Sequence, residues 1–173
     1  MFDQILEKLK PKEQLESIYQ IDFKALKHQG IKGLVLDIDD TLLPRQMLEI
    51  SHVLLSFIEK LKDIGFSIFL MSNNMNQPRV AYIGKTLNLP FSTFSMKPLP
   101  FSFNSACKKM GLSPKEVAVV GDQLFMDILG GNLLGMHTIL VSPMSPETLF
   151  LRQWMRNAEK WVLEKIESNK LGF

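Results

Sequence analysis

The chain has little of what marks several large classes of protein. Its 173 residues include one cysteine, Cys107, so neither an internal disulfide nor a thiolate metal cluster can form. Its 20 lysines and arginines nearly balance 18 aspartates and glutamates, whereas a dedicated nucleic-acid-binding domain is normally far more basic. The longest central stretch without charged or amide side chains, 64–72, is far too short to span a bilayer. These absences argue against a disulfide scaffold, a nucleic-acid partner and a membrane-spanning segment there.

What is present is the composition of an ordinary globular protein, 46% hydrophobic and 22% charged. Since a domain takes about 100–200 residues, we predict a single domain over 1–173, with a core over 21–143 and a C-terminal amphipathic helix over 146–167. A lone cysteine is typical of a reducing compartment. Asp3 and Glu7 stand where an export signal has its apolar region. We therefore expect a cytoplasmic protein, either free or peripheral at the inner face of a membrane.

Short apolar runs alternate with segments of helical periodicity along the chain. The runs are apolar on both faces, which is typical of parallel strands covered by helices on both sides. With right-handed crossovers, this alternation predicts a doubly wound, three-layer α/β domain of about five strands. The expected strands are 31–36, 66–71, a short one around 92–95, 117–120 and 138–141. The expected helices run from 22 to 30, from 51 to 65, from 76 to 87, and over 100–110, 124–134 and 146–167.

Polar residues follow the predicted strands, at the edge of the sheet where a doubly wound fold binds its ligand. Clustered carboxylates without histidine or thiolate neighbours suit Mg²⁺, which prefers oxygen ligands and keeps waters that a phosphate can replace. Hydroxyl and amide donors with a lysine suit the oxygens of a phosphoryl group. No glycine-rich nucleotide loop is present, so the phosphate has to come from a substrate. The residues concerned are Asp37, Asp39, Thr41, Ser72, Asn73, Lys97, Asp122 and Asp127.

These residues occur in a recognisable order. Asp37-Ile38-Asp39-Asp40-Thr41 resembles the DxDxT nucleophile motif of the haloacid dehalogenase (HAD) superfamily. Ser72, Lys97 and the segment from Gly121-Asp122 to Asp127 resemble its second, third and fourth motifs. Over about 21–143 the chain more closely resembles the YqeG-like group of class IIIA phosphatases, which includes phosphatidylglycerophosphate phosphatases of mitochondria, plastids and cyanobacteria. The resemblance implies a HAD-like fold and a Mg²⁺-dependent phosphomonoesterase.

The chemistry of the side chains and the resemblance assign the same catalytic roles. Asp37 is the expected nucleophile, which forms an aspartyl-phosphate. Asp39 is the expected general acid for the leaving alkoxide, and then the base for the attacking water. We expect Ser72, Asn73 and Lys97 to hold the phosphoryl oxygens.

The metal site is expected to consist of Asp37, Asp122 and, by resemblance, the backbone carbonyl of Asp39. Asp127, one helical turn after Asp122, is expected to support the waters of the metal. Thr41 is expected to brace the loop that carries the nucleophile.

The stretches between Asp37, Ser72 and Lys97 are too short for an inserted cap domain, so the site is expected to be capless and open. An open site suits a substrate whose bulk stays outside, such as a phospholipid headgroup. By resemblance that substrate is phosphatidylglycerophosphate. Two alternatives stay open: a soluble phosphomonoester (sugar phosphate, nucleotide or phosphoprotein) and a non-catalytic HAD-like binding module. No obligate protein partner is evident.

The two ends of the chain carry apolar stripes at helical spacing. Trp154 and Trp161 lie in the C-terminal stripe among basic residues such as Arg156, and a shorter stripe runs over 2–9. Such stripes either pack on the core or lie on an anionic membrane surface. Both interpretations are consistent with the sequence.

Overall fold

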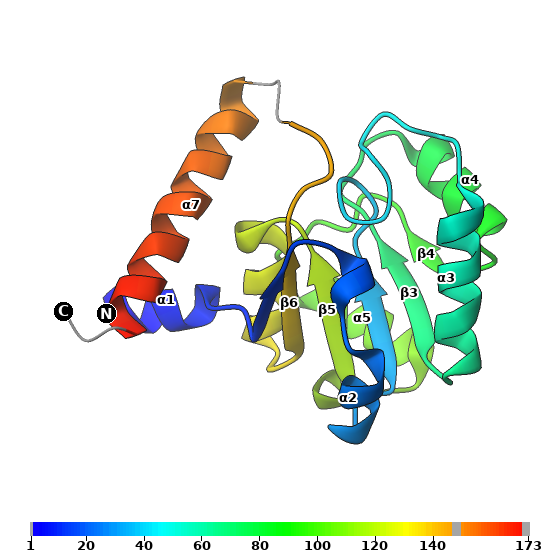
Figure 1. Ribbon diagram of the computed structural model, residues 1–173, viewed down its shortest axis with the longest axis horizontal. Coiled ribbons are helices and arrows are strands. Elements are labelled where there is room, and N and C mark those ends of the chain that lie inside the picture. The colour runs from blue at the N-terminus through cyan, green and yellow to red at the C-terminus, as the bar shows by residue number, and fades with distance from the viewer. Residues whose placement is uncertain (1, 147–149, 171–173) are drawn as a thin grey trace.

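The computed structural model describes residues 2–146 and 150–170 and is built around a parallel β-sheet (Figure 1). The sheet has six strands in the order β1-β6-β5-β2-β3-β4, and all its pairs are parallel. β2 lies between β5 and β3, with Leu36 opposite Val120 on one side and Leu70 on the other. The strands are β1 (Glu13–Leu15), β2 (Gly33–Leu36), β3 (Ser67–Met71), β4 (Phe91–Ser92), β5 (Val117–Gly121) and β6 (His137–Val141). The predicted doubly wound α/β class is confirmed, with six strands in place of about five.

The additional strand, β1, extends the sheet at one edge. It pairs with β6, with Glu13 opposite Ile139, and the Glu13 carboxylate lies 2.7 Å from Nε2 of His137. Its three residues, Glu-Gln-Leu, have neither an apolar run nor an alternating pattern long enough to indicate a strand. This strand depends on its neighbour in the sheet rather than on its own sequence.

Side chains at the N-caps define where the predicted helices begin. Asp22, Ser51 and Asn76 each accept a hydrogen bond from the backbone N–H three residues later, over 2.9–3.2 Å. The helix predicted over 100–110 is confirmed. Pro100 is its first residue, and Gly111, at φ +69°, ends it. These helices are α2 (Phe23–His28), α3 (His52–Asp63), α4 (Gln77–Thr86) and α5 (Pro100–Met110), and short 3₁₀ turns lie at Ile18–Gln20 and Pro114–Glu116.

The apolar helix predicted over 124–134 is divided into two parts. A π-helix, η3, covers Leu124–Ile128, and α6 covers Leu129–Leu133. Such wide turns are rare and are frequently found at functional sites, and this one contains Asp127.

Alternate residues of the central strands face opposite layers of helices. Leu34 and Leu36 belong to a core shared with α2, α3 and α4, whereas Val35 belongs to a core shared with α5. Cys107 lies in the second core, where burial raises the pKa of its thiol to about 11. The sheet and the helices on its two faces form the predicted three layers, and Cys107 packs in one of the two cores between them.

The remaining helices, α1 (Phe2–Leu9) and α7 (Phe150–Lys170), lie together beside the β6 side of the sheet (Figure 1). Leu6 and Leu9 of α1 share a buried cluster with Val162 and Ile166 of α7, and with residues of η3 and β6. The terminal stripes therefore pack in part on each other, whereas Trp154 and Trp161 are exposed. The helix predicted from 146 runs instead from Phe150 to Lys170, and 147–149 lie outside the described residues.

Within residues 2–146 and 150–170, no helix combines the length and the apolar character needed to cross a membrane.

Candidate active site

The loop after β2 turns two aspartates toward the carboxyl edge of the sheet. The Asp37 N–H continues the β2–β5 pairing by donating to the Val120 carbonyl over 2.9 Å. The chain then turns sharply, with Asp40 at φ +62° and the N–H groups of Leu42 and Leu43 both donating to the Ile38 carbonyl. As a result Asp37 and Asp39 line the same pocket.

Lys97 binds two of the predicted acids at once. Its Nζ donates to Asp37 Oδ1 over 2.5 Å, to Asp127 Oδ1 over 2.7 Å and to the Met71 carbonyl over 3.2 Å. Burial alone would lower the pKa of this ammonium, but the carboxylates of Asp127 and Asp37 raise it overall. Lys97 is therefore a permanent cation in the centre of the site.

Three carboxylates form an acidic triad, which we define as Asp37, Asp122 and Asp127. One oxygen from each lies within 4.8 Å of the others, and all three residues are buried. The Thr41 hydroxyl lies between two of them, 3.2 Å from Asp37 Oδ2 and 3.5 Å from Asp122 Oδ1. Gly121 is required for this approach, since a Cβ there would lie 2.2 Å from Cγ of Asp127.

The triad is short of positive charge. Burial raises the pKa of Asp37 well above its usual value despite Lys97, and Asp127 and Asp122 raise it further. Burial likewise raises the pKa of Asp122 to about 7, although Arg156 opposes the shift. An all-oxygen donor set of three close carboxylates fits a hard divalent cation, which would stabilise their ionised forms.

Asp39 lies outside the triad, and its carboxylate accepts hydrogen bonds from three side chains of the β3–α4 region. Arg79 Nη1 donates to Oδ1 over 2.6 Å, while Ser72 Oγ and Asn74 Nδ2 donate to Oδ2 over 3.3 and 2.9 Å. The role predicted for the Asp39 backbone carbonyl as a metal ligand stays a prediction.

The structure brings Ser72 and Asn73 to the site, but their polar groups are engaged within the protein. The Ser72 side chain is fully buried and also accepts from the Asn74 N–H over 3.0 Å. The Asn73 amide donates to the Lys97 carbonyl over 3.0 Å and accepts from the Lys97 N–H over 2.9 Å. Asn73 therefore positions the backbone of Lys97, and a direct bond from either residue to phosphate stays a prediction.

Arg79 is a site residue that the sequence did not indicate. It lies in the first turn of α4, where the helix dipole disfavours a cation. An arginine at this unfavourable position was the one feature of the sequence that could have indicated a functional role. Its guanidinium also donates to the carbonyls of Met47 and Pro44 in the loop before α3. Arg79 thus connects Asp39 to that loop.

The C-terminal helix reaches the site from the other side. Arg156 donates from Nη1 to the Asp122 carbonyl over 2.5 Å and from Nη2 to the Asp122 carboxylate. Glu159 accepts from the Phe125 N–H over 3.1 Å and from Arg156 over 3.2 Å. Nothing in the sequence indicated these contacts, because no residue of the four motifs lies on this helix.

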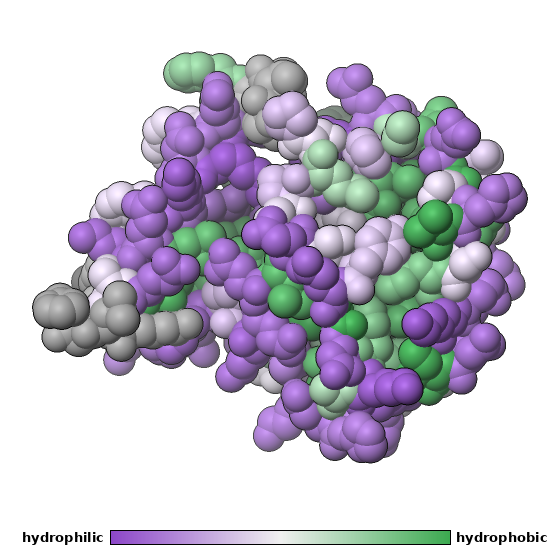
Figure 2. Space-filling view, in the orientation of Figure 1, coloured by the Kyte–Doolittle hydropathy of each residue, from purple (hydrophilic) through white to green (hydrophobic). Residues whose placement is uncertain are grey.

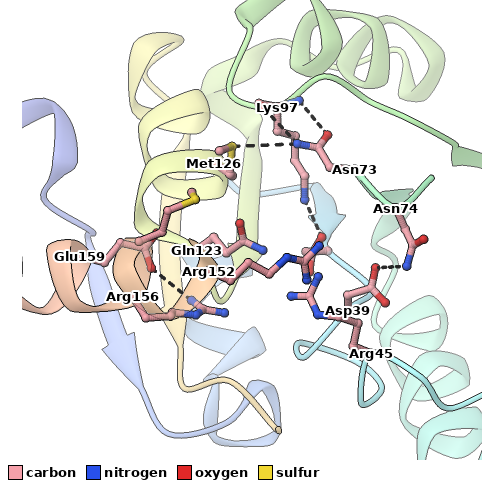
Figure 3. Close-up of a pocket in the computed structure, with 12 residues that line it drawn as sticks. Asp39, Arg45, Asn73, Asn74, Lys97, Gln123, Met126, Arg152, Arg156 and Glu159 are labelled. Carbon is pink, nitrogen blue, oxygen red and sulfur yellow. Dashed lines mark hydrogen bonds and ion pairs between the residues drawn. The ribbon is translucent and has the colours of Figure 1, made fainter. Parts of the chain in front are cut away.

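These elements enclose a cavity of about 200 Å³ (Figure 3). No cap domain lies between Asp37 and Lys97, since the chain between them forms only loops, α3, β3, α4 and β4. The expectation of an open site needs correction, however, because α7 closes one side of the cavity. Figure 2 shows the hollow between α7 and the rest of the molecule. The lining residues are Asp37, Asp39, Arg45, Asn73, Asn74, Lys97, Gln123, Met126, Arg152, Met155, Arg156 and Glu159.

Comparisons with known proteins agree with this arrangement. The mitochondrial PGP phosphatase family matches residues 4–86 and the HAD-hydrolase-like family matches residues 95–143. The chain is 34% identical over 157 residues to the probable phosphatase YqeG of Bacillus subtilis, with 91% of each protein covered. It is 27% identical over 184 residues to phosphatidylglycerophosphate phosphatase 1, chloroplastic/mitochondrial, of Arabidopsis thaliana, covering 94% of this chain and 53% of that protein.

A solved structure shows the same fold. The cobalt-bound deoxy-D-mannose-octulosonate 8-phosphate phosphatase of Haemophilus influenzae superposes with a TM-score of 0.51 at 16% identity, over 80% of this chain and 90% of that one. The parallel sheet brings a lysine and several aspartates together at its carboxyl edge, where such sheets bind their ligands, and this arrangement agrees with the phosphatase class of the relatives. The chain belongs to the HAD superfamily, within its YqeG-like group of class III phosphatases.

Proposed function

We propose that this phosphatase is Mg²⁺-dependent and hydrolyses phosphatidylglycerophosphate to phosphatidylglycerol through an aspartyl-phosphate on Asp37. The observation that carries the chemistry is the position of Asp37, which lies in the acidic triad, contacts Lys97 and lines the same cavity as Asp39. A nucleophile, a cation and a second acid in one pocket are what phosphoryl transfer to a carboxylate requires.

The proposed reaction has two displacements. A carboxylate oxygen of Asp37 attacks phosphorus as the bond to the leaving alkoxide breaks, and Asp39 gives that alkoxide a proton. Asp39 then takes a proton from water, whose oxygen attacks phosphorus, and inorganic phosphate leaves with the Asp37 carboxylate restored. Mg²⁺, when bound by Asp37, Asp122 and the Asp39 carbonyl, supplies charge that offsets the phosphate oxygens.

The other residues have supporting roles in this proposal. Lys97 pairs with the phosphoryl oxygens and keeps its charge because its pKa is raised. Ser72 and Asn73 hold the phosphoryl group or the residues around it, Thr41 braces the nucleophile, and Asp127 orients Lys97 and the metal waters.

The lipid substrate is supported by two independent observations. One is the similarity to a plant phosphatidylglycerophosphate phosphatase along nearly the whole chain. The other is a set of exposed apolar side chains on loops and helix starts at the carboxyl edge of the sheet, which we call the apolar rim. The rim consists of Met75, Phe94, Met96, Leu99 and Phe101.

The proposal extends to location and organisation. We infer a single domain over 1–173 in the cytoplasm, acting in phospholipid biosynthesis at the inner face of a membrane, with no nucleic-acid partner. The rim supports peripheral contact there, because Lys109 lines one pocket with Phe94, Met96 and Phe101, and apolar side chains beside a basic group favour an anionic lipid surface. A soluble phosphomonoester is the second candidate, since Asp37, Asp39 and Lys97 act on the phosphate group that lipid and soluble esters share.

Turnover measurements on three substrates test the proposal. These are phosphatidylglycerophosphate in mixed micelles, glycerol 3-phosphate and para-nitrophenyl phosphate, each with Mg²⁺ and with excess chelator. We expect the highest kcat/KM for the lipid, and loss of turnover with chelator or in Asp37→Asn. A circular dichroism spectrum and melting curve of Asp37→Asn control for folding.

Each other result has a definite meaning. Substantial activity in Asp37→Asn, or full activity in chelator, contradicts the mechanism. A much higher kcat/KM for glycerol 3-phosphate replaces the lipid by the soluble substrate. No turnover on any of the three favours a non-catalytic binding module.

A further inference from the structure

One cation in the cavity stands apart from the others. Arg152, on α7, lines the cavity, and its Nη1 is buried without a hydrogen-bond partner in the part of the chain that the structure describes. Figure 3 shows its side chain reaching from α7 across the cavity toward Asp39 and Arg45. A buried guanidinium nitrogen without a partner is costly, so this position requires an explanation.

Every other cation of the site is paired with a carboxylate. Lys97 is paired with Asp37 and Asp127, Arg156 with Asp122 and Glu159, and Arg79 with Asp39. For Arg152, no ion pair occurs within residues 2–146 and 150–170. Among the described residues, Arg152 is therefore a cavity cation without a carboxylate partner.

Arg45 brings a second guanidinium to the same cavity from a different segment. It lies in the loop between β2 and α3 and forms an ion pair with Asp40 over 3.2 Å through Nη2 and a hydrogen bond through Nε. Like charges repel, so two arginines that line one small cavity are stable together when an anion lies between them. Arg45 and Arg152 thus form a candidate anion site beside the one at Asp37 and Lys97.

The size of the cavity allows a ligand larger than one phosphoryl group. One water needs roughly 10–15 Å³ of accessible space, so a cavity of about 200 Å³ holds much more than a single water. A phosphoryl group at Asp37 and the first atoms of its ester fit within such a volume. A second charged group of the same substrate would then lie at the edge of the cavity, near Arg152 and Arg45.

We propose that Arg152, with Arg45, forms a second anion subsite that binds a phosphodiester group of the substrate beside the phosphomonoester that is cleaved. This proposal rests on the proposed function and deepens it, since it names the feature of the substrate that the enzyme selects. A phosphodiester presents two unesterified oxygens and one negative charge, which match the planar fork of an arginine. In phosphatidylglycerophosphate, a glycerol unit separates the two phosphorus groups.

Kinetics on water-soluble substrates test this subsite without a membrane. We compare dihexanoyl phosphatidylglycerophosphate, which has both phosphorus groups, with glycerol 3-phosphate, which has only the monoester. In Arg152→Ala the ratio of kcat/KM for the first substrate to that for the second is expected to fall about tenfold or more. Arg152→Lys, which keeps the charge but loses the fork, should restore part of the ratio. Lys165→Ala removes an exposed positive charge from the same helix and should leave the ratio unchanged.

A binding experiment separates the subsite from turnover. Calorimetry on Asp37→Asn measures the Kd of dihexanoyl phosphatidylglycerol, which has the diester alone, and of inorganic phosphate. Adding Arg152→Ala should weaken binding of the diester about tenfold and that of inorganic phosphate much less.

The outcomes distinguish this proposal from the function on which it rests. Equal weakening of both ligands assigns Arg152 to the transferred phosphate, and an unchanged diester Kd shows that it binds no substrate anion. Either result overturns the subsite while the phosphatase assignment stands. If the protein turns over no substrate but Arg152→Ala still weakens diester binding selectively, the proposed function fails and the subsite stands.

Discussion

Arg156 donates to two groups of Asp122 at once, the backbone carbonyl and the side-chain carboxylate of that aspartate. The same carboxylate belongs to the acidic triad with Asp37 and Asp127. A guanidinium from the C-terminal helix thus lies where it partly neutralises the acids that would hold a divalent cation. Arg156 and that cation therefore compete for the charge of Asp122.

We predict that Arg156→Ala binds Mg²⁺ more tightly than the unaltered protein, by roughly five- to tenfold, which corresponds to about 1–1.4 kcal/mol. The reason is that the substitution removes a positive charge in direct contact with Asp122. Calorimetric titration of the metal-free protein measures the change, with Lys165→Ala as the control from the same helix. Unchanged or weaker Mg²⁺ binding in Arg156→Ala would show that the arginine supports the metal site instead of competing with it.

Asp39→Asn should distinguish substrates by their leaving groups. An alkoxide needs a proton to leave, whereas an activated aryl oxide does not. We expect kcat for glycerol 3-phosphate to fall at least a hundredfold, within the range typical of a lost general acid, and kcat for para-nitrophenyl phosphate to fall much less. An equal loss on both substrates would mean that Asp39 does not protonate the leaving group.

Arg79 is a positioning residue in this scheme, since it contacts Asp39 and the loop before α3. Arg79→Lys should keep more of the activity on glycerol 3-phosphate than Arg79→Ala, because a lysine retains a charge beside Asp39. A comparison of two substrates gives a second measurement. Arg79→Ala should lower kcat for glycerol 3-phosphate more than kcat for para-nitrophenyl phosphate, because only the alkoxide needs the proton from Asp39, and a merely structural role would not require this difference.

The elements that the sequence predicts well have their determinants nearby in the chain. Pro100 and Gly111 determine both ends of α5, and Ser51 determines the start of α3. β1 had no such local signal because it exists through its pairing with β6. The division of 124–134 into η3 and α6 was also unpredictable from periodicity, since buried residues such as Leu124, Ile128 and Gly131 recur at the spacing of a single helix.

The same distinction holds for the site. The motif residues follow strands, and the order of the strands in a doubly wound sheet brings them together. The positions of Arg79, Arg152 and Arg156 in the site depend on how α4 and α7 pack, and that information is spread over many apolar residues. A sequence pattern shows that α7 has an apolar face but not which carboxylate its arginines will meet.

The metal-free protein should lose stability between pH 5 and pH 8. Burial raises the pKa of Asp122 from 3.8 in the unfolded chain to about 7 in the fold. Between these values the folded state binds more protons than the unfolded state, so the free energy of unfolding falls as the pH rises. We expect Tm to drop by several degrees over this range, and Mg²⁺ to raise Tm more at pH 8 than at pH 5.

Differential scanning calorimetry with and without Mg²⁺ measures both effects, and Asp122→Asn is the control. That variant should lose part of the pH dependence and most of the stabilisation by Mg²⁺. A Tm that rises from pH 5 to pH 8 in the metal-free protein would contradict the prediction.

The apolar rim gives the last prediction, which concerns the membrane. Phe94, Met96 and Phe101 line one shallow pocket, and the two phenylalanines are 50% and 54% exposed. Because they follow β4, they lie at the same edge of the sheet as the catalytic loop. Contact through this edge would place the cavity against the lipid headgroups.

We therefore expect the double variant Phe94→Ser/Phe101→Ser to bind vesicles containing phosphatidylglycerol several-fold more weakly than the unaltered protein in co-sedimentation. Leu133→Ser is the matched control, since Leu133 is 43% exposed and ends α6, at the turn that leads into the opposite edge of the sheet. Raising the salt concentration should weaken binding further, because each basic residue near an anionic surface contributes about 1 kcal/mol. If the double variant binds as well as the control while Trp154→Ala does not, the membrane contacts α7 instead, and the outer side of that helix takes the place of the rim.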